Sequence, residues 1–499
     1  MSRPLVPALA AVVLSLAVPS VRAQEYDPFR VFYDRARPLP QPAGAPGVQV
    51  PASESLAPGD EARARALLRA EGLARRAWPG FGLFDQPILL SRKGGPAVLI
   101  GHTSPPAGFE KAAMEGASRP VYVLREGMEL DFTFVTDVDL GGVPTYGQRV
   151  LGEGEPSSST VALAVHERFH VRQSAAFSEQ VRPPYPLEAK ESPENIAWAE
   201  IEQKLLSAAL RDPSRARARL RAFQAVREHR YGRFGKDVAS VERWEESTEG
   251  TAEYVELRVL DQLSPAKGVM KGDLVRRLGQ APSPESMDKW RAYATGASMG
   301  RLLDRIEPGW KARVERGEGP YDVLASGLGP IPEGEMKVLL DSVAREFGYG
   351  AALERAGKEA GRSREARRKA IERFEGQKGR RLKVTLRWVP GTRSYFSSRG
   401  DTHETGPYET LFEEVREYLF QNEAMRVKVR NRPLWLRAGS VEFFLPEEGK
   451  FLLDGKPWSP GGGPSSFRES SASSEGIEVS LKAGTLSLEG GALTLVPRP

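Results

Sequence analysis

Two histidines four residues apart are the side chains of this sequence best placed to do chemistry. His166 and His170 lie in the stretch 157–173, where an apolar run leads directly into the pattern His-Glu-x-x-His. On a helix, residues at this spacing project from one face, so both imidazoles can reach the same metal ion. Glu167 is rotated around the helix axis, which suits it to act as a general base on a water at the metal rather than as a ligand.

The surroundings of the motif favour a metal ion over two ordinary core histidines. The apolar run 161–165 and Phe169 predict a buried helix, in which an unpartnered polar group costs about 1–3 kcal/mol. A divalent cation would compensate this cost for several groups at once. The chain has five histidines and no cysteine, so a metal site must use imidazole and carboxylate ligands. The pattern therefore predicts one Zn²⁺ ion, and the competing interpretation is a chance match among satisfied core histidines.

A third ligand is expected from a later acidic helix within 237–263. Its glutamates recur at steps of three and four residues: Glu242, Glu246, Glu249, Glu253 and Glu256. Like charges at this spacing destabilise a helix, and the alternative interpretation of the series is a solvated acidic face. Gly250 and Ala252 are small, and a mid-helix glycine is costly, which favours close approach of a second helix beside Glu249.

The two motifs HERFH and TEGTAEY together resemble the gluzincin zinc metallopeptidases of the peptidase-MA-like superfamily. The resemblance implies that His166, His170 and Glu249 bind zinc and that Glu167 is the catalytic base. It also implies that Glu253 is the carboxylate that orients a ligand histidine without itself binding the metal.

Other residues remain open at this stage. Glu245, Glu246 and Glu253 are the alternative third ligands. Tyr293, on a later helix, is a weak candidate for stabilising the oxyanion, and a packing role is the alternative.

Hydrophobic patterning predicts an α+β protein with several parts. A small sheet is expected to precede the motif helix, and a β-rich domain follows, interrupted by one helix near 408–420. The resemblance implies that the sheet and the helical region form a zincin-like catalytic domain. The expected boundaries are a signal peptide at 1–23, a Pro-rich leader at 24–60, a mostly β part at 61–155, a helical part at 156–378 and the C-terminal domain at 379–499.

The N-terminus indicates export. Arg3, an apolar run at 7–18 and a small-residue cleavage site at Ala23 are typical of a secretory signal peptide. No later stretch is long and apolar enough to span a membrane, so no transmembrane anchor is expected after cleavage. The 71 basic and 66 acidic residues form no basic stripe, which argues against nucleic-acid binding. We therefore expect a periplasmic or extracellular protein.

These features together predict an exported zinc metallopeptidase whose partner is a peptide or protein substrate. Glu167 would activate a zinc-bound water for attack on the peptide carbonyl. Two alternatives stay open: a non-catalytic zincin-like envelope protein that only binds, and a zinc hydrolase of non-peptide amides or esters.

Overall fold

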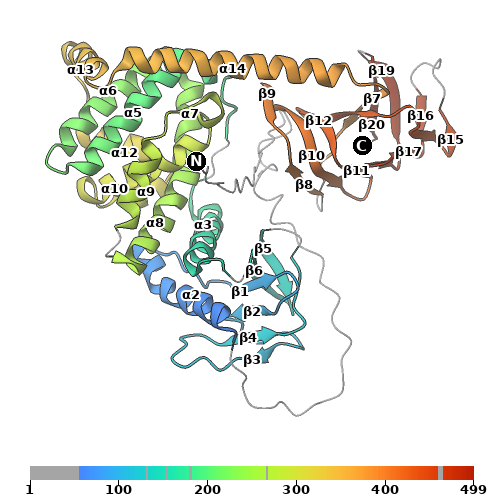
Figure 1. Ribbon diagram of the computed structural model, residues 1–499, viewed down its shortest axis with the longest axis horizontal. Coiled ribbons are helices and arrows are strands. Elements are labelled where there is room, and N and C mark those ends of the chain that lie inside the picture. The colour runs from blue at the N-terminus through green and yellow to red at the C-terminus, as the bar shows by residue number, and fades with distance from the viewer. Residues whose placement is uncertain are drawn as a thin grey trace, which may run out of the picture. The chain divides into compact units, whose positions relative to one another are not determined.

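The computed structural model describes residues 56–130, 133–152, 154–178, 182–265, 268–389, 392–458, 465–489 and 491–498. The expected signal peptide lies outside these residues, as does most of the expected leader. The described residues fall into two compact units, one ending at Ala360 and the other beginning at Gly361. The chain is mixed α+β, with an N-terminal sheet, a helical middle region and a β-rich C-terminal region (Figure 1).

The first unit opens with one helix and a six-stranded sheet. Helix α2 is Pro58–Ala77, and the strands are β1 Ile88–Arg92, β2 Ala97–Ile100, β3 Glu110–Lys111, β4 Val121–Leu124, β5 Phe134–Leu140 and β6 Val143–Val150. The strand order is β3-β4-β2-β1-β6-β5, and only the β1–β6 pair is parallel. Strand β5 is therefore an edge strand next to β6, from which the chain runs into the motif helix.

The rest of this unit is helical. Its elements are α3 Ser157–Ala176, α4 Leu187–Lys190, α5 Pro193–Arg211, α6 Ala216–Phe234, α7 Lys236–Glu245, the π-helical turn η1 Glu246–Gly250, α8 Thr251–Leu263, α9 Val269–Leu278, the 3₁₀ turn η3 Pro284–Ser286, α10 Trp290–Ile306, α11 Trp310–Glu315, α12 Pro320–Leu328, α13 Glu333–Glu346 and α14 Tyr349–Glu375. Ser192 caps α5, as its place before Pro193 predicts. Helix α3 begins at Ser157, with Pro156 at its N-cap position.

One continuous apolar core joins the sheet to these helices. It includes Trp78 after α2, Tyr146 on β6, Phe169 on α3 and Tyr254 on α8, all fully buried or nearly so. Helix α3 contacts α2, β5 and β6 as well as α8 (Figure 1). The motif helix is therefore enclosed by elements on several sides, as its apolar sequence predicts.

The second unit is a fourteen-stranded sheet with its own core. The strands are β7 Arg380–Thr385, β8 Arg393–Ser398, β9 Thr402–Gly406, β10 Glu409–Gln421, β11 Met425–Val429, β12 Arg432–Arg437, β13 Ser440–Leu445, β14 Lys450–Leu453, β15 Lys456–Pro457, β16 Ser465–Phe467, β17 Ser470–Ser474, β18 Ile477–Leu481, β19 Gly484–Glu489 and β20 Ala492–Pro497. All pairs are antiparallel except β7 with β20.

One expectation about this region is corrected. The helix expected near 408–420 is wrong, because these residues form the long strand β10. A register shift between Phe412 and Val415 breaks the two-residue alternation, so the apolar positions imitate helical spacing. The division between the two units lies within α14, because its residues through Ala360 belong to the first unit and its later residues, including Phe374, belong to the second.

Candidate metal centre

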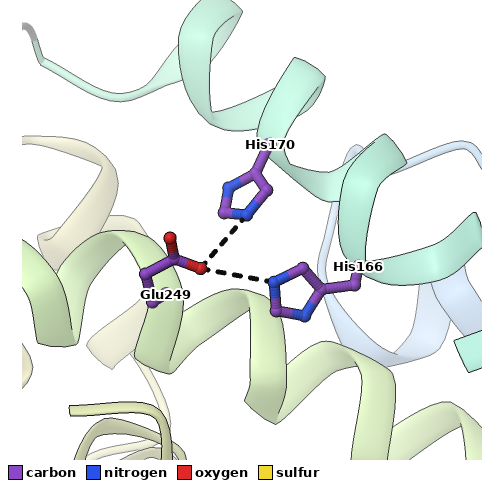
Figure 2. A group of neighbouring side chains, drawn as sticks. All are labelled: His166, His170 and Glu249. Atoms are coloured by element: carbon purple, nitrogen blue, oxygen red, sulfur yellow. Dashed lines mark hydrogen bonds and ion pairs between the residues drawn. The ribbon is translucent and has the colours of Figure 1, made fainter. Parts of the chain in front are cut away.

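Helix α3 and the segment η1–α8 bring the predicted ligands together. His166 and His170 project from successive turns of α3, and Glu249 lies in η1, which packs near it (Figure 2). The Oε2 atom of Glu249 lies 3.4 Å from Nε2 of His166 and 3.4 Å from Nε2 of His170. Ligand atoms about 2.0–2.1 Å from a tetrahedral zinc ion are about 3.3–3.4 Å apart, so this spacing fits that ion.

The tautomer of His166 leaves the nitrogen facing Glu249 free to bind a metal. Its Nδ1 lies 3.1 Å from Oε2 of Glu256, a carboxylate oxygen that can only accept, so Nδ1–H donates. Nε2 of the neutral ring then carries a lone pair directed at Glu249. Burial opposes a charge on His166, but contacts with Glu249 and Glu256 outweigh it and raise the pKa of the imidazole well above its usual value.

The tautomer of His170 follows from the amide of Gln173. The Nε2 group of Gln173 lies 3.2 Å from the carbonyl oxygen of Ser247 and 2.7 Å from that of Thr248, and it donates because carbonyl oxygens only accept. Its Oε1 atom therefore faces Nδ1 of His170, 2.6 Å away, and accepts from it. In the neutral ring of His170, Nε2 therefore carries a lone pair, and this lone pair is directed at Glu249.

If both rings are neutral, three electron-rich atoms meet at this point, and the raised pKa of His166 indicates that a proton on this ring relieves part of their repulsion when no metal is bound. Protonation of His166 would satisfy one contact and leave the lone pair of His170 facing the carboxylate. A cation bound between the three atoms would satisfy all of them. The donor set of two imidazole nitrogens and one carboxylate oxygen is one that zinc accepts.

A local change of helix type presents Glu249 to the histidines. The sequence predicts one helix over 237–263, but five of its residues form the π-helical turn η1 between α7 and α8. Such turns are rare and occur frequently at functional sites. Gly250, the residue after Glu249, packs closely on Gly296 of α10. A Cβ atom added to Gly250 would lie only 2.7 Å from the Cα atom of Gly296. This is the close helix approach that the small residues beside Glu249 predict.

Glu167, the expected general base, follows His166 on α3 and lies near both imidazoles. It has neither a hydrogen bond nor an ion pair with any residue in the ranges described. Burial raises the pKa of its carboxyl, and the neighbouring imidazoles offset this only in part. A raised pKa brings a carboxylate closer to the range in which it works as a general base near neutral pH.

Lys289 and Tyr293 approach Glu249 from the start of α10. The Lys289 ammonium lies 3.0 Å from Oε1 of Glu249, the oxygen that does not face the histidines. Tyr293 lies near Glu249 and stacks on His166, with ring centroids 5.8 Å apart and planes 11° apart. Burial opposes the charge on Glu249, but Lys289 and the two imidazoles hold its pKa well below the usual value.

The other acidic candidates have different partners. Glu253, expected to orient a ligand histidine, pairs with Arg277 at 3.0 Å, while Glu256 makes the contact with His166. Glu245 pairs with Arg182 at 2.5 Å.

Glu242 and Glu246 belong to a fully buried charge cluster rather than to a solvated face. The cluster contains three acids and three arginines from α5, α6, α7, η1 and α10: Glu202, Arg227, Arg230, Glu242, Glu246 and Arg291. Glu246 accepts from Arg227 at 2.8 Å and from Thr295 at 2.7 Å, which anchors η1 three residues before Glu249.

The sequence analysis assigned no role to three residues that contact the candidate ligands, namely Glu256, Gln173 and Lys289. Glu256 was part of the acidic series but had no assigned role. Gln173 lies one turn beyond His170, so its spacing was a usable signal. Lys289 had no signal, because its contact with Glu249 depends on how α10 packs against η1.

Comparison of the chain with protein families, with curated proteins and with solved structures finds no match.

Proposed function

We propose that this protein is an exported zinc-dependent peptidase of the gluzincin type. The proposal depends on one observation: the Nε2 atoms of His166 and His170 each lie 3.4 Å from a single oxygen of Glu249, which is the spacing of ligands around tetrahedral zinc. The other two histidine contacts, to Glu256 and Gln173, hold the tautomers that such binding requires. A small sheet preceding the motif helix is consistent with a zincin-like domain.

Each residue would have a defined part in hydrolysis. When bound, zinc supplies a Lewis acid that polarises a carbonyl and acidifies water. Glu167 would take a proton from the attacking water and deliver it to the leaving amine. Glu256 and Gln173 would keep the imidazoles oriented, and the buried position of the ligands would strengthen their electrostatic effect. Tyr293 would stay close to the reacting carbonyl through its contacts with His166 and Glu249.

Export is proposed on the N-terminal sequence alone, since residues 1–23 lie outside those described. Among the described helices, none combines the length and the apolar character that a membrane crossing requires.

Metal analysis and peptide hydrolysis on matched variants test the proposal. Wild type should retain about one zinc per chain after dialysis and lose activity with a chelator. His166→Ala and Glu249→Ala should lose the metal. His229→Ala is a control in the same unit, because His229 packs on Trp198 away from the centre. Glu167→Gln should keep zinc while kcat falls by roughly 10²–10⁴-fold.

The rival functions predict other results. Wild type that holds zinc but is as inert as Glu167→Gln would be a binding protein. Chelator-sensitive cleavage of esters or non-peptide amides alone would identify the other hydrolase class. A wild type that binds no divalent metal would refute the centre itself.

A further inference from the structure

The first residues of α10 place a cation and an exposed aromatic ring beside the candidate centre. Lys289 occupies the N-cap position of α10, where the helix dipole disfavours a positive charge. Its ammonium contacts Oε1 of Glu249 at 3.0 Å, and a single carboxylate therefore separates it from the two imidazoles. The dipole does not explain a lysine here, but an anionic ligand would.

The ammonium has hydrogen-bonding capacity to spare. Lysine carries three N–H donors, and Glu249 is the one acceptor or ion-pair partner of Lys289 within the described ranges. The side chain of Lys289 is 19% exposed, so the protein does not enclose it completely. A carboxylate is the ligand that would complete this partly buried site.

A row of stacked rings runs from the centre to the surface next to this ammonium. Tyr293 stacks on the buried His166, and Trp290 stacks on Tyr293 with centroids 5.7 Å apart and planes 21° apart. The Lys289 Nζ lies 5.9 Å from the Trp290 ring centroid and 6.0 Å from that of Tyr293. Trp290 is 48% exposed and is the one aromatic residue among the large exposed hydrophobic side chains of the described chain.

We infer that Lys289 selects peptides that carry a carboxylate next to the scissile bond, and that Trp290 packs against the apolar part of the same residue. The inference rests on the proposed function. A peptide advances about 3.3–3.6 Å per residue, so a group one residue from a bond held at the imidazoles is within reach of Lys289. The carboxylate can belong to an acidic side chain or to the free C-terminus of the substrate.

The competing explanation is that Lys289 only neutralises Glu249, and it makes a different prediction. A residue that acts solely through Glu249 affects all substrates equally, whereas a substrate-binding residue changes the ratio between charged and neutral ones. Lys311 offers a matched control. Its ammonium also lies within 6 Å of aromatic rings and 3.8 Å from an acid, Asp304, and it is 18% exposed.

Peptide binding to the zinc-loaded Glu167→Gln protein tests the inference without turnover. Calorimetry would compare three otherwise identical peptides: one with Glu beside the target bond and an amidated end, one with Gln and an amidated end, and one with Gln and a free C-terminus. At least one carboxylate-bearing peptide should bind roughly 10–100-fold more tightly than the neutral peptide. Comparison of the two charged peptides identifies the source of the carboxylate.

Variants of Lys289 and Lys311, each combined with Glu167→Gln, test the role of Lys289. Lys289→Met should abolish the preference while retaining zinc, Lys289→Arg should retain most of it, and Lys311→Met should leave it unchanged. Equal or undetectable binding of all three peptides by the parent protein overturns the inference. So does a Lys289→Met variant that weakens all three peptides by the same factor or keeps the preference. Failure of the proposed function is separate, because it shows as absent zinc or absent chelator-sensitive hydrolysis in wild type.

Discussion

Replacing Gly250 by alanine should destabilise the protein, although the same change usually stabilises a helix. Alanine is favoured over glycine in a helix interior by about 1 kcal/mol. At Gly250, however, the new Cβ would lie 2.7 Å from the Cα of Gly296 and 2.9 Å from the carbonyl oxygen of Ala292. Both are backbone atoms, so neither can rotate away, and η1 and α10 must separate.

Gly272 supplies the matched control for this substitution. It lies within α9, is exposed, and has no atom within 4 Å of an added Cβ. Gly272→Ala should therefore raise the free energy of unfolding by about 1 kcal/mol through helix propensity, with no opposing clash. Overpacking typically costs about 1–3 kcal/mol, so the free energies of unfolding of the two variants should differ by about that amount.

Urea denaturation of the metal-free proteins measures this difference, and zinc titration supplies a second readout. Gly250→Ala should also bind zinc more weakly, because Glu249 is the adjacent residue and moves with η1. Gly272→Ala should bind zinc as wild type does. If Gly250→Ala is stabilised as much as Gly272→Ala, the close contact between η1 and α10 does not exist and the argument for the position of Glu249 is wrong.

Three further predictions concern charged groups around the centre. Glu256→Gln should weaken zinc binding by roughly 10–100-fold in a competition assay, because His166 loses its anionic partner, whereas Glu253→Gln should change it little. Burial, then repulsion from Glu256, raises the pKa of Glu253 to about 8 in the metal-free protein. Folding therefore favours the protonated acid, and this contribution to stability should be lost as pH rises from about 4.5 through about 8. Urea midpoints at pH 5 and pH 8 should accordingly differ less for Glu253→Gln than for wild type. Arg230→Met should cost about 3–5 kcal/mol of unfolding free energy in the same assay, because Glu202 and Glu242 lose a fully buried partner; a loss below 1 kcal/mol would contradict it.

Local patterns were reliable where one short stretch decides the structure. The alternation of apolar and turn residues predicted the N-terminal strands, and the Ser-Pro pair predicted the start of α5. Patterns misled where a local irregularity changes the period. The bulge in β10 made a strand resemble a helix, and the π turn at Glu246–Gly250 was invisible because its residues suit an α-helix equally well.

The sequence by itself determined that His166 and His170 share a helix face, with Glu167 beside them, because four-residue spacing has one geometric outcome on a helix. It also limited the candidate third ligands to the acidic helix within 237–263 and indicated a close approach at Gly250. Only the tertiary structure decided which acids meet the imidazoles. Glu249, Glu256 and Lys289 come from elements distant from the motif, and the packing of η1, α8 and α10 against α3 sets their contacts. Helical periodicity fixes directions within one element, whereas the meeting of side chains from several elements depends on how those elements pack.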